Sequence, residues 1–147
     1  MKKNILIQLA LVGSLACSLQ ADFVRDSANE VVLDTKTNLI WQDNNEAVGD
    51  TNKKTWADAI TYCEALDLGG YSDWHLPNIN ELYNLADRTK YEPAFSSAFT
   101  NVESYFFHWS STSKDSSNAW VVNFSYGHNS YSAIESTFNV RCVRSAD

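Results

Sequence analysis

Apolar and polar positions follow a strand-like pattern at both ends of the chain and a helical pattern between them. Val31-Val32-Leu33 is β-rich and residues 34–38 are turn-forming, which predicts a β-hairpin over residues 23–39, with Leu39-Ile40-Trp41 returning as the second strand. Four more strands are expected over residues 105–112, 119–126, 130–137 and 138–144, with turns at 113–117 and 127–129. The polar segment 42–54 has no apolar period, so we expect a solvated loop there.

Two helices are expected in the middle of the chain. Thr55 caps the first, and Gly69-Gly70 are expected to end it. Its buried stripe at helical spacing comprises Trp56, Ala59, Ile60, Cys63 and Leu66. The buried face of the second comprises Ile79, Leu82, Tyr83, Leu85 and Ala86. Residues 88–104 then form an irregular connection that folds Phe95 and Phe99 onto the core. These elements predict an α+β domain, with two helices packed on a mostly antiparallel sheet.

The stretch between the helices, residues 69–82 (GGYSDWHLPNINEL), is expected to be a structural corner. A tryptophan at a tight turn between two helices is expected to pack in the interior, and an aspartate before it can accept hydrogen bonds from the backbone of the turn. The pattern Asn-x-x-Glu is that of a helix capping box. The corner residues are Asp73, Trp74, Pro77 and Asn78, with Glu81 completing the box. Arg141 and Arg144 near the end of the chain are expected to pair with Asp73 or Glu81.

Residues 1–21 have the pattern of a secretory signal peptide. Lys2 and Lys3 precede an apolar run, and cleavage is expected after Ala21. The run is about a dozen residues, short of the ~20 that span a bilayer, so no membrane span is expected. Lipidation at Cys17 is disfavoured, because bulky Leu15 lies where a lipoprotein signal has a small residue. The exported chain is then residues 22–147, the size of a single domain.

Charge and cysteine content narrow the function classes. The full chain has net charge −7, and without residues 1–21 it holds nine basic and eighteen acidic residues, net −9. Such a surface repels polyanions, so we expect no nucleic-acid partner. Two cysteines remain, Cys63 and Cys142, and in an exported protein such a pair indicates a disulfide. A metal site or a catalytic thiol is the alternative, but no CxxC spacing supports it.

Six segments, in this order along the chain, resemble one known family. They are residues 39–42 (LIWQ), 56–63 (WADAITYC), 69–78 (GGYSDWHLPN), 109–112 (WSST), 119–124 (AWVVNF) and 140–144 (VRCVR). This pattern resembles the Lcl C-terminal domain, the C-terminal domain of the Legionella collagen-like protein and formerly a domain of unknown function, over about residues 31–144. The resemblance implies an exported bacterial domain with a C-type-lectin-like fold, in which a disulfide from the first helix to the last strand is a hallmark.

The resemblance also implies a ligand, because the family's namesake is an adhesin domain that binds sulfated glycosaminoglycans. This chain departs from the family at His75, where the family usually has an arginine, and its net charge argues against sulfated polyanions. The chain has no collagen-like repeat, so no trimer is implied and the oligomeric state stays open. Fold transfers across such a resemblance better than ligand does.

Metal and catalytic sites find little support in the sequence. Counting an EF-hand loop from Asp43 puts Val48 where a glycine is required. The calcium-dependent sugar motifs of C-type lectins fail as well, since Leu76 precedes Pro77-Asn78 and no acidic residue follows Trp120. No Gly-x-Ser-x-Gly elbow is present, and His108 with Ser110-Ser111 does not make a triad. We therefore expect no cofactor, no metal and no catalytic residue.

Residues 105–131 are dense in aromatic side chains. Trp109, Trp120 and Phe124 are expected in the core. Residues near the expected 127–129 turn are the candidate ligand surface, namely Tyr126, His128, Asn129 and Tyr131. The function expected is a non-enzymatic, lectin-like or adhesin-type module that contacts a glycan, or an envelope or host protein. A periplasmic assembly component that binds only a protein is the alternative, and an enzyme is the third class.

Overall fold

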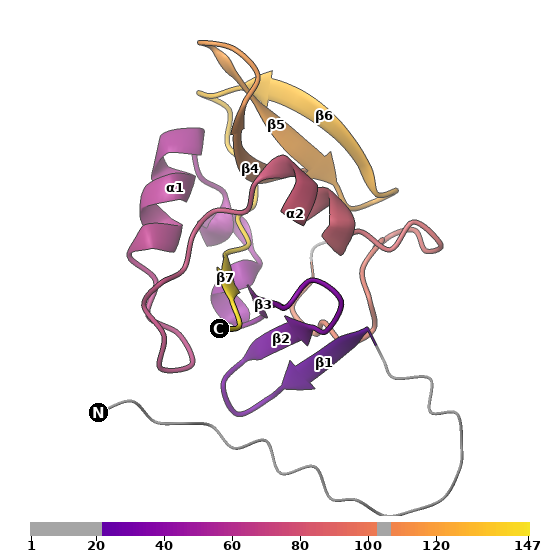
Figure 1. The fold of residues 1–147 in the computed structure, drawn as a ribbon. Helices are drawn as coiled ribbons and strands as arrows, with labels where there is room; N and C mark the ends of the chain where they lie inside the picture. The colour runs from indigo at the N-terminus through magenta and orange to yellow at the C-terminus, as the bar shows by residue number, and fades with distance from the viewer. Residues whose placement is uncertain (1–21, 103–106) are drawn as a thin grey trace, which may run out of the picture.

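A computed structural model describes residues 22–102 and 107–147 of the chain (Figure 1). Its elements in order are β1 (Phe23–Asp26), β2 (Val31–Asp34), β3 (Leu39–Gln42), the 3₁₀ helices η1 (Asn45–Ala47) and η2 (Asp50–Asn52), α1 (Trp56–Glu64), α2 (Ile79–Leu85), β4 (Phe107–Ser113), β5 (Asn118–Asn123), β6 (His128–Ala133) and β7 (Val143–Ser145). The expected signal peptide, with Cys17, lies outside the described residues. In the described part of the chain, no helix has the length and apolar character needed to cross a membrane.

The strands form two antiparallel sheets, so the α+β prediction is confirmed. One sheet has the order β1-β2-β3-β7 and the other the order β4-β5-β6. The predicted hairpin is the β2–β3 pair, and β1 extends it by one strand. The expected strand over residues 138–144 is wrong. Only residues 143–145 form a strand, β7, and it pairs with β3 in the other sheet because residues 138–142 cross between the two sheets. The likeness to C-type lectins stays a prediction.

Helix α1 begins as predicted but ends early. The Asp58 N–H donates to the Thr55 hydroxyl at 3.4 Å, so Thr55 is the N-cap. The helix ends at Glu64, not at the glycine pair. Gly69 and Gly70 instead form the tip of a separate turn, and both have positive φ values (64° and 80°). Such a turn needs glycine, so the pair serves this turn and not the helix end.

The disulfide Cys63–Cys142 is present and joins α1 to the segment that precedes β7. Around it lies one buried cluster, which includes Trp74, Trp109 and Val121. A second buried cluster lies under α2, and it contains the two phenylalanines expected there, Phe95 and Phe99, with Trp41, Leu82, Val122 and Phe124. The β4-β5-β6 sheet lies between the helices, because Val121 belongs to the first cluster and its neighbour Val122 to the second.

The corner at residues 69–82 is built as the sequence predicts. Trp74 is buried, and its indole N–H donates to the Tyr71 carbonyl at 3.1 Å. Arg144 donates to both oxygens of Asp73, at 2.6 and 3.0 Å, and its guanidinium lies 3.8 Å from the centre of the Tyr71 ring. Arg144 therefore holds the corner to β7, and the side-chain bond from Arg144 lowers the pKa of Asp73. The expected pairing of Arg141 with this corner is wrong, since Arg141 pairs with Asp43.

A full capping box starts α2. The Glu81 N–H donates to Asn78 Oδ1 at 2.9 Å, and the Asn78 N–H donates to Glu81 Oε2 at 2.8 Å. We expect Asn78→Ala to lower the free energy of unfolding by about 1 kcal/mol, because one N-terminal donor loses its acceptor. Urea denaturation measures this loss. Asn84→Ala is the matched control on the exposed face of the same helix and is expected to change stability little; equal losses in both variants would contradict the capping role.

Residues 42–54 are not a solvated loop, contrary to the expectation from their polarity. Gln42, Asp43 and Asn52 are buried, and each is bonded inside the protein. The Gln42 side chain, for example, accepts from the Cys142 N–H at 3.1 Å and donates to the Tyr62 hydroxyl at 2.8 Å. Polar composition therefore failed to predict burial here because the partners come from distant parts of the chain.

Asp43 is the centre of a buried charged cluster. It accepts from the backbone N–H groups of Thr100 and Asn101, at 2.9 and 3.1 Å. Its carboxylate pairs with the guanidinium of Arg141 at 3.2 Å and also contacts Arg25. Burial, with a smaller effect from Arg25, lowers the pKa of Arg141 to about 9. Arg141 therefore still carries its charge at neutral pH, and Asp43 is its buried counter-ion.

Candidate binding site

A shallow hollow lies between α2 and the outer part of the β4-β5-β6 sheet. Helix α2 crosses one face of this sheet, and β6 forms the sheet's edge beyond it (Figure 1). The hollow has a volume of about 270 Å³, and its lining residues are Ile79, Asn80, Tyr83, Trp120 and Asn129. It therefore combines one side of α2 with side chains from β5 and β6.

Trp120 reaches the hollow because of strand alternation. Its neighbours Ala119 and Val121 point to the opposite face and are fully buried, whereas Trp120 is only partly buried. In the β5–β6 register Trp120 lies opposite Tyr131, and their rings meet edge to face with centroids 5.9 Å apart. Paired residues share a face of the sheet, so the half-exposed ring of Tyr131 extends the aromatic surface beside the hollow.

Strand β4 positions both walls of the hollow. The Ser110 hydroxyl donates to the Trp120 carbonyl at 2.8 Å. The Thr112 hydroxyl accepts from the Ile79 N–H at 3.0 Å, and the Ser111 N–H donates to the Pro77 carbonyl at 2.8 Å. The start of α2 and the strand that carries Trp120 are thereby tied to the same segment. Side chains held on bonded elements in this way form a preorganised surface.

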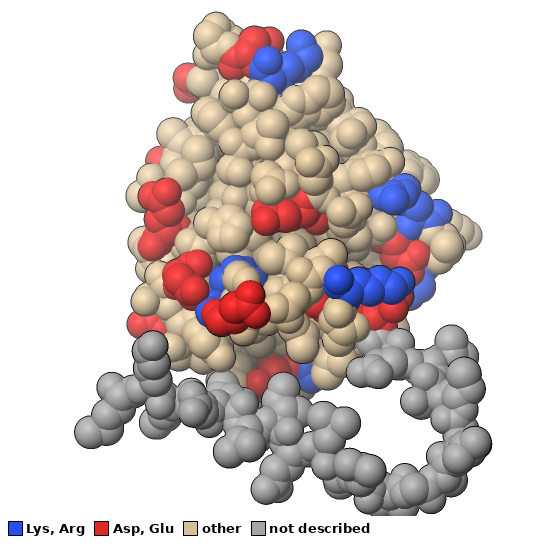
Figure 2. Space-filling view, in the orientation of Figure 1, with Lys and Arg blue, Asp and Glu red and all other residues tan. Residues whose placement is uncertain are grey.

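The lining of the hollow is uncharged and consists of the aromatic rings of Tyr83 and Trp120, the amides of Asn80 and Asn129, and the aliphatic side chain of Ile79. Among the described residues that line it, none carries a carboxylate, an ammonium, a guanidinium or an imidazole. Nearby cations are engaged with rings: the Arg88 guanidinium lies 4.2 Å from the Tyr83 ring centre, and Lys114 Nζ lies 4.2 Å from that of Tyr131. Figure 2 likewise shows few charged side chains over this sheet except at its tip, in contrast to the lower half of the same face.

Comparison with family models shows which family the chain belongs to. The model of the Lcl C-terminal domain matches residues 30–144. The chain belongs to the Lcl C-terminal domain family. No curated protein matches it. The family match agrees with the resemblance in the six segments, and it covers all the described helices and all strands except β1 and the last residue of β7.

In this Lcl C-terminal domain the four residues of the predicted ligand surface do not form a single patch. Asn129 lines the hollow, and Tyr131, which is 51% exposed, lies beside Trp120. His128 is exposed, but alternation along β6 puts it on the other face of the sheet. Tyr126 is 59% exposed, and its hydroxyl bonds Glu92 at 3.2 Å. The expected turn at 127–129 is wrong, because His128 and Asn129 already belong to β6.

Sequence reasoning missed most of the hollow. Trp109 and Phe124 are fully buried as expected, but Trp120 is not. The signal for Trp120 was its position between two small apolar residues of an alternating strand, which points it away from their side. Asn80 and Tyr83 gave no comparable signal, because their role depends on the face that α2 turns toward β5 and β6.

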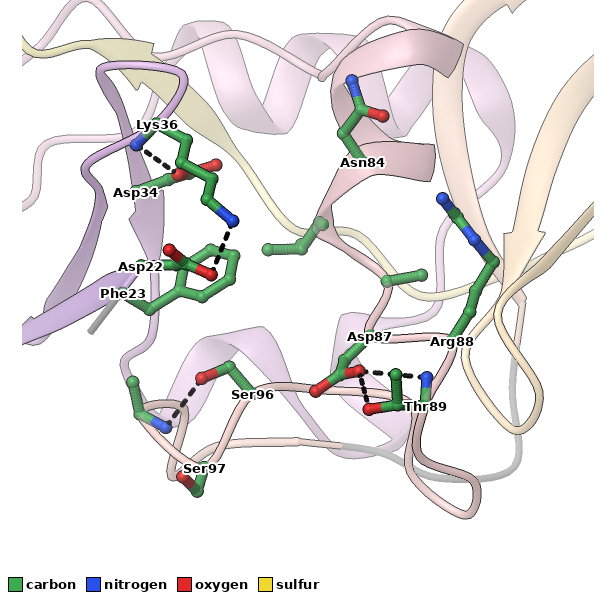
Figure 3. A pocket seen from close by; sticks show the side chains of 13 residues that line it. Asp22, Phe23, Asp34, Lys36, Asn84, Asp87, Arg88, Thr89, Ser96 and Ser97 are labelled. Atoms are coloured by element: carbon green, nitrogen blue, oxygen red, sulfur yellow. Dashed lines mark hydrogen bonds and ion pairs between the residues drawn. The ribbon is translucent and has the colours of Figure 1, made fainter. Parts of the chain in front are cut away.

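A larger, more polar cleft of about 850 Å³ lies between the β1–β2 hairpin and the end of α2 (Figure 3). Its carboxylates already have partners. Asp22 bonds Lys36 Nζ at 2.7 Å on one wall, and Asp87 bonds the Thr89 hydroxyl at 2.6 Å on the other. The bond from Thr89 holds the pKa of Asp87 below its usual value. The first contact is a surface ion pair and the second is a bond within a local turn, so both carboxylates are already engaged. The smaller aromatic hollow is therefore the better candidate site.

No metal site can be assigned from the side chains described. In residues 22–102 and 107–147, no group of three or more His, Cys, Asp or Glu side chains is placed to hold a metal ion. Calcium therefore gains no support from the geometry, and the expectation that the domain works without a cofactor stays a prediction.

Proposed function

We propose that this domain is an exported, non-enzymatic binding module whose ligand is an uncharged saccharide of the cell envelope or of a host surface. One observation carries the proposal: the rings of Trp120 and Tyr131 lie partly exposed beside the amides of Asn80 and Asn129. Aromatic faces cover the apolar C–H faces of a sugar, and amides both donate to and accept from its hydroxyl groups.

Charge supports a neutral ligand over a sulfated one. The exported chain carries net charge −9, and no arginine or lysine lines the hollow. The two nearby cations, Arg88 and Lys114, are single charges that lie over the rings of Tyr83 and Tyr131. A polyanion would approach a repulsive surface without the basic cluster that phosphate or sulfate recognition uses. The sulfated ligand that the family resemblance implies is therefore not the ligand we propose for this chain.

The remaining parts of the proposal are export and the absence of catalysis. The pattern of residues 1–21 supports export through a signal peptide cleaved after Ala21. A disulfide joins Cys63 and Cys142 and both are buried, which argues against thiol chemistry. A protein partner at the same hollow is the second candidate, because tyrosine and tryptophan are enriched in protein interfaces.

We expect Trp120→Ala and Tyr131→Ala to weaken saccharide binding by about tenfold or more, since each removes one stacking face. The full chain would be produced in an exporting host, and binding would be screened on an array of neutral and sulfated glycans. Calorimetry would then measure the affinity for the best neutral glycan. Tyr126→Ala is the matched control, because Tyr126 is about as exposed as Tyr131 (59% and 51%) but does not line the hollow. This variant is expected to bind the saccharide as the unaltered protein does.

Two results would count against the saccharide proposal. Binding to sulfated glycans alone, or equal losses in all three variants, would show that the hollow is not a neutral-sugar site. If no glycan binds, affinity capture from envelope extracts tests the protein partner, with Trp120→Ala as the negative bait. If a protein is captured, if its capture depends on Trp120, and if sugars do not compete with it, the ligand of the hollow is a protein and not a saccharide.

A further inference from the structure

Strand β6 is an open sheet edge with unusual composition. It is six residues long, and β5 is its only partner strand among the described residues. From Gly127 to Ile134 the sequence GHNSYSAI contains no lysine, arginine, aspartate or glutamate. Natural proteins usually protect such edges with charges, proline or short length. This edge lacks all three protections.

Other sheet edges in the described part of the chain are protected. On the far side of β4, the Trp109 N–H donates to the Asn139 carbonyl at 3.0 Å, so residues 138–139 cover that edge. Strand β1 is only four residues long and carries Arg25 and Asp26. Strand β7 is bridged by His75 on its outer side. The open edge of β6 is therefore an exception within this fold.

The register of β6 determines which of its backbone groups point outward. Just beyond the strand, the Ile134 N–H donates to the Ser117 carbonyl at 3.0 Å, which marks a hydrogen-bonded pair. Such pairs alternate along antiparallel strands, so Ser130 and Ser132 bond to β5. The N–H and C=O groups of Asn129 and Tyr131 then point away from β5, toward the open side.

We propose that β6 pairs with β6 of a second copy of this chain. The two strands are antiparallel, and the two-fold axis that relates them passes between Ser130 of one copy and Ser130 of the other. In this register Asn129 of each copy lies opposite Tyr131 of the other. These are the two residues whose backbone groups point outward. The N–H of each therefore donates to the carbonyl of the residue opposite, and its own carbonyl accepts from that residue's N–H. The two three-stranded sheets become one continuous sheet, and the contact is isologous.

Charge favours a second copy as the occupant. Two-fold pairing places His128 opposite Ser132, so no like charges of lysine, arginine or carboxylates meet along the strand. The one cation noted beside the strand, Lys114, is engaged with the Tyr131 ring of its own copy. No charge within β6 selects a foreign strand, whereas its outward groups complement themselves in this register. The net charge of the exported chain, −9 from nine basic and eighteen acidic residues, lies outside β6, so it opposes association at long range, where salt screens it.

The pairing also extends the hollow, a step that rests on the proposed function. Asn129 of the second copy comes to lie beside Tyr131 on the face that carries Trp120, because opposite residues share a face. A saccharide chain could then contact both copies across the two-fold axis. Dimerisation itself does not depend on any ligand, so the two proposals can fail separately.

Sedimentation equilibrium of the protein exported from the full chain tests the pairing. We expect a monomer–dimer equilibrium that tightens as sodium chloride is raised. Ser130→Lys sets two like charges against each other at the axis and is expected to weaken the dimer by about tenfold or more. Asn129→Pro, which removes an outward donor, is expected to weaken it as well. Ser116→Lys is the matched control at an exposed turn and is expected to leave the dimer unchanged.

A monomer at every concentration and salt level would overturn the proposal, and so would a dimer that both edge variants leave intact. If the variants do not fold, amide exchange in the unaltered protein decides. The amides of Asn129 and Tyr131 must then become more protected as the protein concentration rises. Protection that is independent of concentration would also overturn the pairing.

Discussion

Replacing both cysteines, in Cys63→Ala/Cys142→Ala, is expected to remove about 4 kcal/mol of the free energy of unfolding. The disulfide closes a loop between residues 79 positions apart, and in the chain-entropy model a loop of this length restricts the unfolded chain by about 4 to 5 kcal/mol. Both positions are fully buried, so the loss of two sulfur atoms adds a small packing cost. Total stability is typically only about 5–15 kcal/mol, so the variant should approach the unfolding threshold.

Urea denaturation with and without a reductant measures this effect. The unaltered protein in reductant should fall to nearly the stability of the double variant, whereas the double variant should not respond to reductant. A loss below about 1 kcal/mol would show that the unfolded chain is restricted by other contacts, and it would contradict the role given to the bridge.

The parts of this fold that the sequence predicts well are those governed by local chemistry. Asn78 and Glu81 form the expected capping box, Thr55 caps α1, and the 34–38 turn joins β2 to β3. In each case the residues that interact are within a few positions of one another. The cysteine pair was also predictable, because only one pairing is possible in the exported chain.

The errors arose where the decisive partner is distant in the sequence. Polar residues 42–54 gave every sign of a solvated loop, yet Asp43 is buried because Thr100, Asn101 and Arg141 converge on it. Residues 138–144 have the pattern of a strand, yet they cross between sheets and only their end pairs with β3. A local pattern cannot indicate which sheet a segment joins.

The candidate site shows the same division. The exposure of Asn129 and Tyr131 was predicted correctly from a nearby turn, although that turn lies at residues 124–127 and not at 127–129. The hollow itself needs α2 to lie over one face of β5, and no local pattern places a helix on one face of a sheet and not the other. For the same reason His128, adjacent to Asn129 in sequence, is separated from it by the thickness of the sheet.

The buried carboxylate leads to the second large effect. Asp43→Asn is expected to lower the free energy of unfolding by about 3 to 5 kcal/mol, because it leaves the buried guanidinium of Arg141 without its counter-ion. Asparagine has nearly the same shape, so packing is kept and the change isolates the charge. The amide also presents an N–H group toward Arg141 or toward the Thr100 and Asn101 donors, where only acceptors fit.

Asp50→Asn is the matched control for this prediction. Asp50 belongs to the same polar segment, but its side chain is 96% exposed, and it pairs with Lys53 on the surface at 2.7 Å. Surface pairs contribute about 0 to 1 kcal/mol, so this variant should unfold at nearly the urea concentration of the unaltered protein. If residues 42–54 were a solvated loop, both variants would behave alike. A small and equal effect in the two would therefore overturn the buried-cluster assignment, and a large loss confined to Asp43→Asn would establish it.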